Sequence, residues 1–147
     1  MHIEKELLSE LKSEQKKWLG RAIVGIIVVD GIVDKSEMDS LREAIGFLEN
    51  EEEINDLVNQ VKDRICPPLG YLDIKHRLAA RLLMNLAQIT IVDNKFSQKE
   101  AEYLKEIGSR MKVEGKFAQQ VLTWIHALLE VNKLKQELLK KADNPLF

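Results

Sequence analysis

The sequence contains little of what marks a secreted, disordered or membrane-spanning protein. Its 147 residues include one cysteine, three prolines and seven glycines, which excludes a disulfide framework and a collagen-like or low-complexity chain. The longest apolar run, residues 22–29, is interrupted by Gly25 and closed by Asp30. It is far shorter than the roughly 20 apolar residues that cross a bilayer. The first residues carry acids where a signal peptide has basic side chains, so we expect a cytoplasmic protein without a membrane span.

A surplus of charge of either sign is also absent. Lys and Arg number 22 against 24 Asp and Glu, which leaves a net charge of −2. Because no basic excess is available to displace counterions from DNA or RNA, we expect no nucleic-acid partner. Hydrophobic residues at 45% and charged residues at 31% are typical of a globular protein. The length suits one domain with a core that needs no cross-link.

Apolar residues recur at steps of three and four along most of the chain, which predicts α-helices. The stretch 23–29 is rich in β-branched residues and taken alone would suggest a strand, but it continues an upstream helical stripe. We expect helices over about 3–29, 35–48, after Asn50, from Asp73 to Ile91, from Ser97 to Met111, and a long last one marked by apolar residues from 117 to 139. Residues 66–70 break the pattern, and Cys66 is expected to be a small core residue.

The second half of the chain repeats the first at a constant offset. Asp30 falls on Asp93, and Glu37 falls on Glu100. The apolar faces stay in phase through three helices of each unit, which would leave either unit with an exposed apolar face if it stood alone. We therefore predict an all-α single domain over residues 1–147. It consists of two three-helix repeats, about 19–65 and 82–128, related by a pseudo-twofold axis and flanked by terminal helical extensions.

The repeated element is an acidic turn between two helices. In the first copy Asp34 and Glu37 have the spacing of a capping box, and Ser97 and Glu100 have it in the second. Gly31 suits the left-handed position that ends a helix, as Asn94 does in the second copy. Capping therefore explains most of the motif. It explains Asp30 and its counterpart Asp93 poorly, because a carboxylate in a last helical turn faces the negative end of the helix dipole. Each of the two needs a partner: the amides of its own turn, the N-terminus of the next helix, or a cation.

The alternative interpretation of the first turn is a divalent-metal site. The carboxylates of Asp30, Asp34 and Glu37 lie around one tight turn and would repel one another unless a proton or a cation joined them. Oxygen ligands of this kind suit Mg²⁺ or Ca²⁺. The turn is not an EF-hand loop, because the third place, counted from Asp30, is Ile32. A second site at Asp93 and Glu100 is weaker, since a serine stands there in place of one acid.

Motifs of catalysis are absent from the sequence, which has no Gly-rich phosphate loop, nucleophile elbow or His-Glu-x-x-His pattern. We therefore expect a non-enzymatic module that binds a protein partner or associates with itself. A metal-dependent hydrolase using the acidic turn is one alternative. A structural helical oligomerisation domain is the other, and exposed apolar residues on the first and last long helices would support it.

At the acidic turns the chain resembles the TerB-like domain family, which occurs in tellurite-resistance TerB proteins and in DjlA-type co-chaperones. The family's pattern is an Asp-Gly turn after an apolar helix, an acid a few residues later, and a helix that begins with Glu, present twice. Asp30-Gly31, Asp34 and Glu37 match it in the first half, and Asp93 and Glu100 match it in the second. The resemblance covers about residues 19–129. It implies an all-helical fold, a divalent-metal site at the turns, and a role in stress response or as an interaction module.

Overall fold

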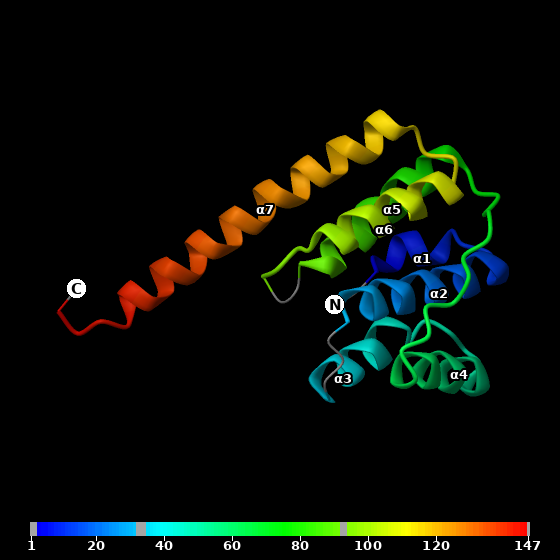
Figure 1. The fold of residues 1–147 in the computed structure, drawn as a ribbon, viewed down its shortest axis with the longest axis horizontal. Helices are drawn as coiled ribbons and strands as arrows, with labels where there is room; N and C mark the ends of the chain where they lie inside the picture. The colour runs from blue at the N-terminus through cyan, green and yellow to red at the C-terminus, as the bar shows by residue number, and fades with distance from the viewer. Residues whose placement is uncertain (1–2, 32–34, 92–93, 147) are drawn as a thin grey trace.

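The structure, a computed structural model of residues 1–147, describes residues 3–31, 35–91 and 94–146, with the backbone alone at 36 and 37. These residues form seven α-helices and no strand (Figure 1). The helices are α1 Lys5–Ser9, α2 Ser13–Asp30, α3 Lys35–Ala44, α4 Glu51–Lys62, α5 His76–Thr90, α6 Gln98–Arg110 and α7 Gly115–Ala142. The prediction of an all-α fold is confirmed, and residues 23–29 are helical.

The single first helix expected over residues 3–29 is wrong, because the chain breaks between Ser9 and Ser13 into α1 and α2. The apolar spacing does not reveal this break, since Leu11 within it is itself buried, at 7% exposure. The side chain of Gln15 stabilises the start of α2, where its Oε1 accepts a hydrogen bond from the Lys12 amide at 2.7 Å. A short helix and a turn thus present the same apolar stripe as one long helix would.

Two further boundaries and the burial of one residue differ from the prediction. Helix α3 ends at Ala44, and a turn rather than helix follows it. Helix α5 begins at His76 and not at Asp73, whose carbonyl accepts a hydrogen bond from Gln15 Nε2 at 3.0 Å. Cys66 is exposed rather than part of the core. By contrast, Asn50 caps α4 as expected, since its Oδ1 accepts from the amides of the second and third helical residues at 2.9 and 3.3 Å.

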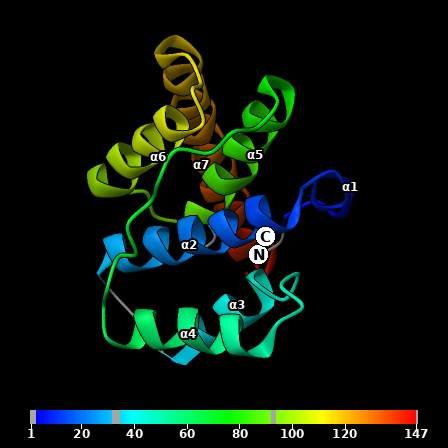
Figure 2. The same cartoon turned by 90° about the vertical axis from the view of Figure 1, so that its right-hand side faces the viewer.

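The helices pack in two groups of three, with α2, α3 and α4 in mutual contact and α5, α6 and α7 in mutual contact. Helix α2 lies between the α3–α4 pair and the second group (Figure 2). It packs against α6 across a close approach at Gly25, where an added Cβ would overlap the ring and hydroxyl of Tyr103. Tyr103 is buried, at 7% exposure. A residue without a side chain therefore sets the distance between the two groups.

The helix boundaries follow the offset seen in the sequence. The offset that aligns Asp30 with Asp93 also aligns the first residue of α2 with that of α5, and the first residue of α3 with that of α6. Helix α7 corresponds to α4 and begins one position later than the offset predicts. The contacts between the groups do not repeat in the same way. Helix α2 contacts α6, but the corresponding pair, α5 and α3, makes no contact of similar extent among the described residues. Helix α5 instead contacts α1. The helix order therefore repeats along the chain. The superposition of the two units about a pseudo-twofold axis stays a prediction.

The segment joining the two groups, residues 63–75, runs along the outside of both (Figure 1). It leaves α4 through Arg64, which has a φ of 56°, and Ile65 donates a backbone hydrogen bond to Gln60. The indole Nε1 of Trp18 on α2 then donates to the Gly70 carbonyl at 2.8 Å. The Leu72 amide donates to the carbonyl of Arg110 at the end of α6, at 2.9 Å. The linker is thus fastened to one helix of each group.

Helix α7 is the longest element, with 28 residues, and only its first half packs on the body of the molecule. Its remainder projects past α5 and α6 toward the C-terminus (Figure 1). No helix in the part of the chain that the structure describes is long and apolar enough to cross a membrane.

Candidate interaction surface

The first acidic turn is only partly described. Helix α2 ends with the half-buried Asp30, and Gly31 adopts the left-handed conformation expected of it, with a φ of 76° and its amide donating to Val28 at 3.0 Å. Asp34 and the side chain of Glu37 lie outside the described residues. Only one of the three predicted metal ligands can therefore be placed, at the end of α2.

The second turn ends in the capping box that the spacing predicts. Ser97 Oγ accepts from the Glu100 amide at 3.1 Å, and Glu100 Oε1 accepts from the Ser97 amide at 3.0 Å. Glu100 is buried, at 5% exposure. Asn94 is left-handed, with a φ of 61°. Asp93 lies outside the described residues, and the Glu100 carboxylate serves as a helix cap.

Among the residues that the structure places, no three His, Cys, Asp or Glu side chains lie close enough to hold a metal ion. Asp34 and Asp93 are not among those residues. The metal site at the turns therefore stays a prediction.

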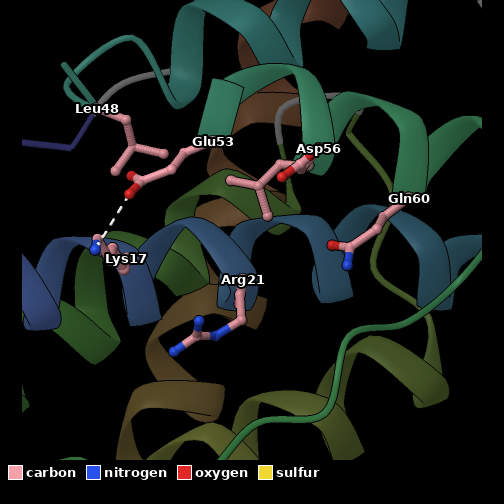
Figure 3. Close-up of a pocket in the computed structure, with 7 residues that line it drawn as sticks. Lys17, Arg21, Leu48, Glu53, Asp56 and Gln60 are labelled. Atoms are coloured by element: carbon pink, nitrogen blue, oxygen red, sulfur yellow. Dashed lines mark ion pairs between the residues drawn. The ribbon is translucent and has the colours of Figure 1, made fainter. Parts of the chain in front are cut away.

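A cleft between α2 and α4 has a volume of about 270 Å³. It is lined by the side chains shown in Figure 3, of which Lys17 and Glu53 form an ion pair at 3.2 Å. Arg21 and Asp56 add one further charge of each sign, so the lining has no net charge. The Oε1 atom of Gln60 is buried without a hydrogen-bond partner among the described residues. The cleft is slightly smaller than typical ligand pockets, which begin near ~300 Å³, and its charges neutralise one another.

The second half of α7 carries the clearest unpartnered surface among the described residues. We call residues 130–142 the arm. Apart from the half-buried Asn132, every residue of the arm is exposed. Three of its large apolar side chains share one side of the helix, Val131 at 60%, Leu134 at 55% and Leu138 at 57% exposure. We call these three residues the outer stripe.

The outer stripe does not continue the buried face of α7. Its three residues each follow a buried residue by nine positions, namely Leu122, Ile125 and Leu129. Nine residues are about two and a half helical turns, so the outer stripe lies on the opposite side of the helix from the core. The first positions that would continue the buried face, Asn132 and Gln136, are polar, and the 49% exposed Leu139 follows them on that side. Beyond Leu129, three of the four large apolar residues of α7, Val131, Leu134 and Leu138, therefore lie on the face opposite the core.

Sequence reasoning placed the last leucines of the chain in a long helix and named exposed apolar residues there as the mark of an association domain. It did not identify the outer stripe, because Leu138 fits the general spacing of an apolar helix face. The signal that identifies the stripe is the nine-residue step from the core positions. That step becomes visible once the buried side of α7 is known.

Comparison with known proteins returns no match, whether to a family model, to a curated protein or to a solved structure. The resemblance to the TerB-like family therefore depends on the residues of the acidic turns alone.

Proposed function

We propose that this chain is a cytosolic, non-enzymatic interaction module of TerB-like type that binds a protein partner through the outer stripe of its α7 arm. The observation that carries the proposal is the change of apolar face at the end of the core. A helix that merely overran its domain would need no apolar residues on its far side, since exposed apolar surface gains nothing until something covers it.

The composition of the arm supports this function. Its polar positions are filled mainly by Lys, Glu and Gln, which favour helix, and Glu130 and Lys133 pair at 3.7 Å on the surface. Helices of about 12–15 residues are only marginally stable in water unless they pack against something. The arm continues a helix that the core already holds at Ile125 and Leu129, so it is presented in the conformation that a partner would bind.

The two halves of the chain differ at this point in a way that also favours a binding role. At the offset that aligns the two acidic turns, Pro67 and Pro68 occupy the places of Glu130 and Val131. Helix α4 has already ended at Lys62, and the prolines keep the linker from returning to helix, whereas the second half continues as helix at the corresponding positions. The arm is thus an addition to the repeated unit. Of the roles that the TerB-like resemblance implies, the arm favours the interaction module, and a role in stress response depends on the resemblance alone.

Photo-crosslinking in cells would test the proposal. A photoreactive residue such as benzoylphenylalanine is placed at Leu134 in the outer stripe or, as the matched control, at Gln136, which is exposed on the other side of the same helix. We expect more adducts at position 134 than at 136, because the stripe holds three of the four large exposed apolar side chains of the arm and Leu139 alone lies near position 136. Adducts at neither position, or equally at both, would contradict the proposal.

A further inference from the structure

We propose that the outer stripe pairs with the outer stripe of a second copy of this chain, so that two arms lie side by side in parallel. This inference rests on the proposed function, because it identifies the occupant of the surface that the proposed function assigns to binding. It is carried by the spacing of the stripe, the charges beside it and its position relative to the body.

The stripe has the spacing of a two-helix seam. Followed upstream, it continues through the exposed Ala127 to the half-buried Trp124, so that the steps along the seam alternate between three and four residues. This is the heptad pattern of a coiled coil. Val131 takes the first core position and Leu134 the second. Among parallel coiled coils, a β-branched residue at the first position and leucine at the second favour two helices over three or four.

The charges beside the seam distinguish parallel from antiparallel pairing. Glu130 comes directly before the core residue Val131, and Lys135 comes directly after the core residue Leu134, five residues after Glu130. In a parallel pair these two flanking positions of opposite chains face each other, which gives two symmetry-related Glu130 to Lys135 pairs. An antiparallel pair would bring like flanking positions together. The contact that Glu130 makes within its own chain, with Lys133, is exposed and costs little to give up, since the Glu130 side chain is 75% exposed.

The position of the stripe leaves room for the second copy. Because the outer stripe lies opposite the buried residues of α7, a helix that covers it approaches from the side away from the body. The same patch on both copies then forms a self-complementary contact about a twofold axis, which is the commonest arrangement of soluble oligomers. The body of each copy then lies on the side of its arm that faces away from the other copy.

A lipid surface suits the arm less well. Helices that lie in a membrane interface carry Trp or Phe on the apolar face and Lys or Arg along the polar face. Trp124 at the upstream end of the seam is half-buried against the core, residues 130–142 contain no aromatic residue, and Glu130 and Glu137 border the stripe. The stripe is also small for a protein interface, which leads us to expect a dimer with a dissociation constant on the order of 100 μM.

Sedimentation equilibrium of the full chain, from about 10 μM to 1 mM, tests the pairing. A reducing agent is present throughout, because the exposed Cys66 could otherwise link two copies covalently. We expect a monomer–dimer equilibrium. Leu134→Glu should weaken it at least about tenfold, since it places two carboxylates in the seam, while the control Gln136→Glu should leave it unchanged. Both variants should keep the wild-type Tm, because neither residue contacts the core.

Charge reversal tests the orientation. Glu130→Lys and Lys135→Glu should each weaken the dimer, because each creates two like-charge pairs, and the double reversal should restore it. Cysteine is also placed in the seam of a chain that carries Cys66→Ser. On oxidation, two copies of the Val131→Cys variant should form a disulfide with each other, and so should two copies of the Leu138→Cys variant. An antiparallel pair would link neither variant with itself, because it places each first core position opposite a second core position.

The results separate this inference from the proposed function. A chain that remains monomeric at the highest concentration overturns the pairing, even if position 134 forms adducts with a different protein in cells and so supports the proposed function. A chain that dimerises while neither cysteine variant forms a disulfide with itself overturns the parallel arrangement. A monomeric chain that binds vesicles containing phosphatidylserine, and loses this binding in Leu134→Glu, overturns the pairing and the protein partner together.

Discussion

Asp30 and its turn show how two explanations of the same residues can be separated. The carboxylate lies at the C-terminal end of α2, where the helix dipole disfavours negative charge by about 0.3–1 kcal/mol. In the second turn, Ser97 and Glu100 cap α6, and a serine occupies the place that Asp34 has in the first. The second turn is capped with a serine at this place, so the carboxylate of Asp34 in the first turn is one more than capping requires.

Our prediction for this turn is that millimolar Ca²⁺ or Mg²⁺ raises the Tm of the wild type. A cation bound only by the folded state, at 100 times its Kd, adds about 2.7 kcal/mol to the free energy of unfolding. Asp30→Asn should abolish the response while keeping most of the metal-free stability, because an amide oxygen still accepts hydrogen bonds but attracts a hard cation less. Calorimetry with and without metal measures both.

The control for this experiment is Asp93→Asn in the second turn, where the predicted site is weaker. It should leave the response to metal largely unchanged. A wild type whose Tm does not respond to either cation would remove the metal prediction and leave the turn as a helix cap.

Between elements, the close approach of α2 to α6 depends on one glycine. We expect Gly25→Ala to lower the free energy of unfolding by about 1–3 kcal/mol, because the added methyl overlaps the Tyr103 ring and forces the two helices apart. Urea denaturation measures the change. Burial raises the pKa of the Tyr103 phenol, aided by the neighbouring Cys66 and Glu106, so the hydroxyl stays neutral throughout the experiment.

The matched control is Gly46→Ala, in the turn after α3. A Cβ added there meets only backbone oxygens, at 3.4 and 3.5 Å. Its effect on the free energy of unfolding should stay within about 0.5 kcal/mol. A Gly25→Ala variant as stable as the wild type would show that the helices can separate at this point without cost.

The helix boundaries show how much of the fold can be predicted from the sequence. Six of the seven helices begin or end near residues that the apolar spacing and the caps at Asn50 and Ser97 indicate. The break before α2 was not predictable from spacing, since Leu11 keeps the apolar stripe intact through it. The start of α5 was misplaced because the Asp73 carbonyl is held by Gln15, 58 residues away in the sequence. Local patterns carry no information on such a contact.

For the candidate surface the limit was different. Periodicity shows that a helix has an apolar side, but it does not show where along the helix the core ends. Leu129 and Leu134 look alike in the sequence, yet the first is buried and the second is 55% exposed. The distinction depends on how far α5 and α6 extend beneath α7. That extent is a property of the tertiary packing.

At the scale of the whole molecule, we expect both groups of helices to unfold together. The contact of α2 with α6 joins them directly, and the linker adds hydrogen bonds to Trp18 on one side and to Arg110 on the other. Differential scanning calorimetry should therefore give one transition, with a van't Hoff enthalpy equal to the calorimetric enthalpy. Two separate transitions would show that the groups are independent domains.

The division of α7 at Leu129 has a consequence for how this sequence can change. Replacing the buried Ile125 or Leu129 by alanine would cost about 2–5 kcal/mol, a large part of the stability of a domain of this size. The same replacement in the outer stripe removes no contact with the body. One half of a single helix is therefore constrained by folding, while the other half is not, so the surface that we propose for binding can change in sequence without loss of the fold.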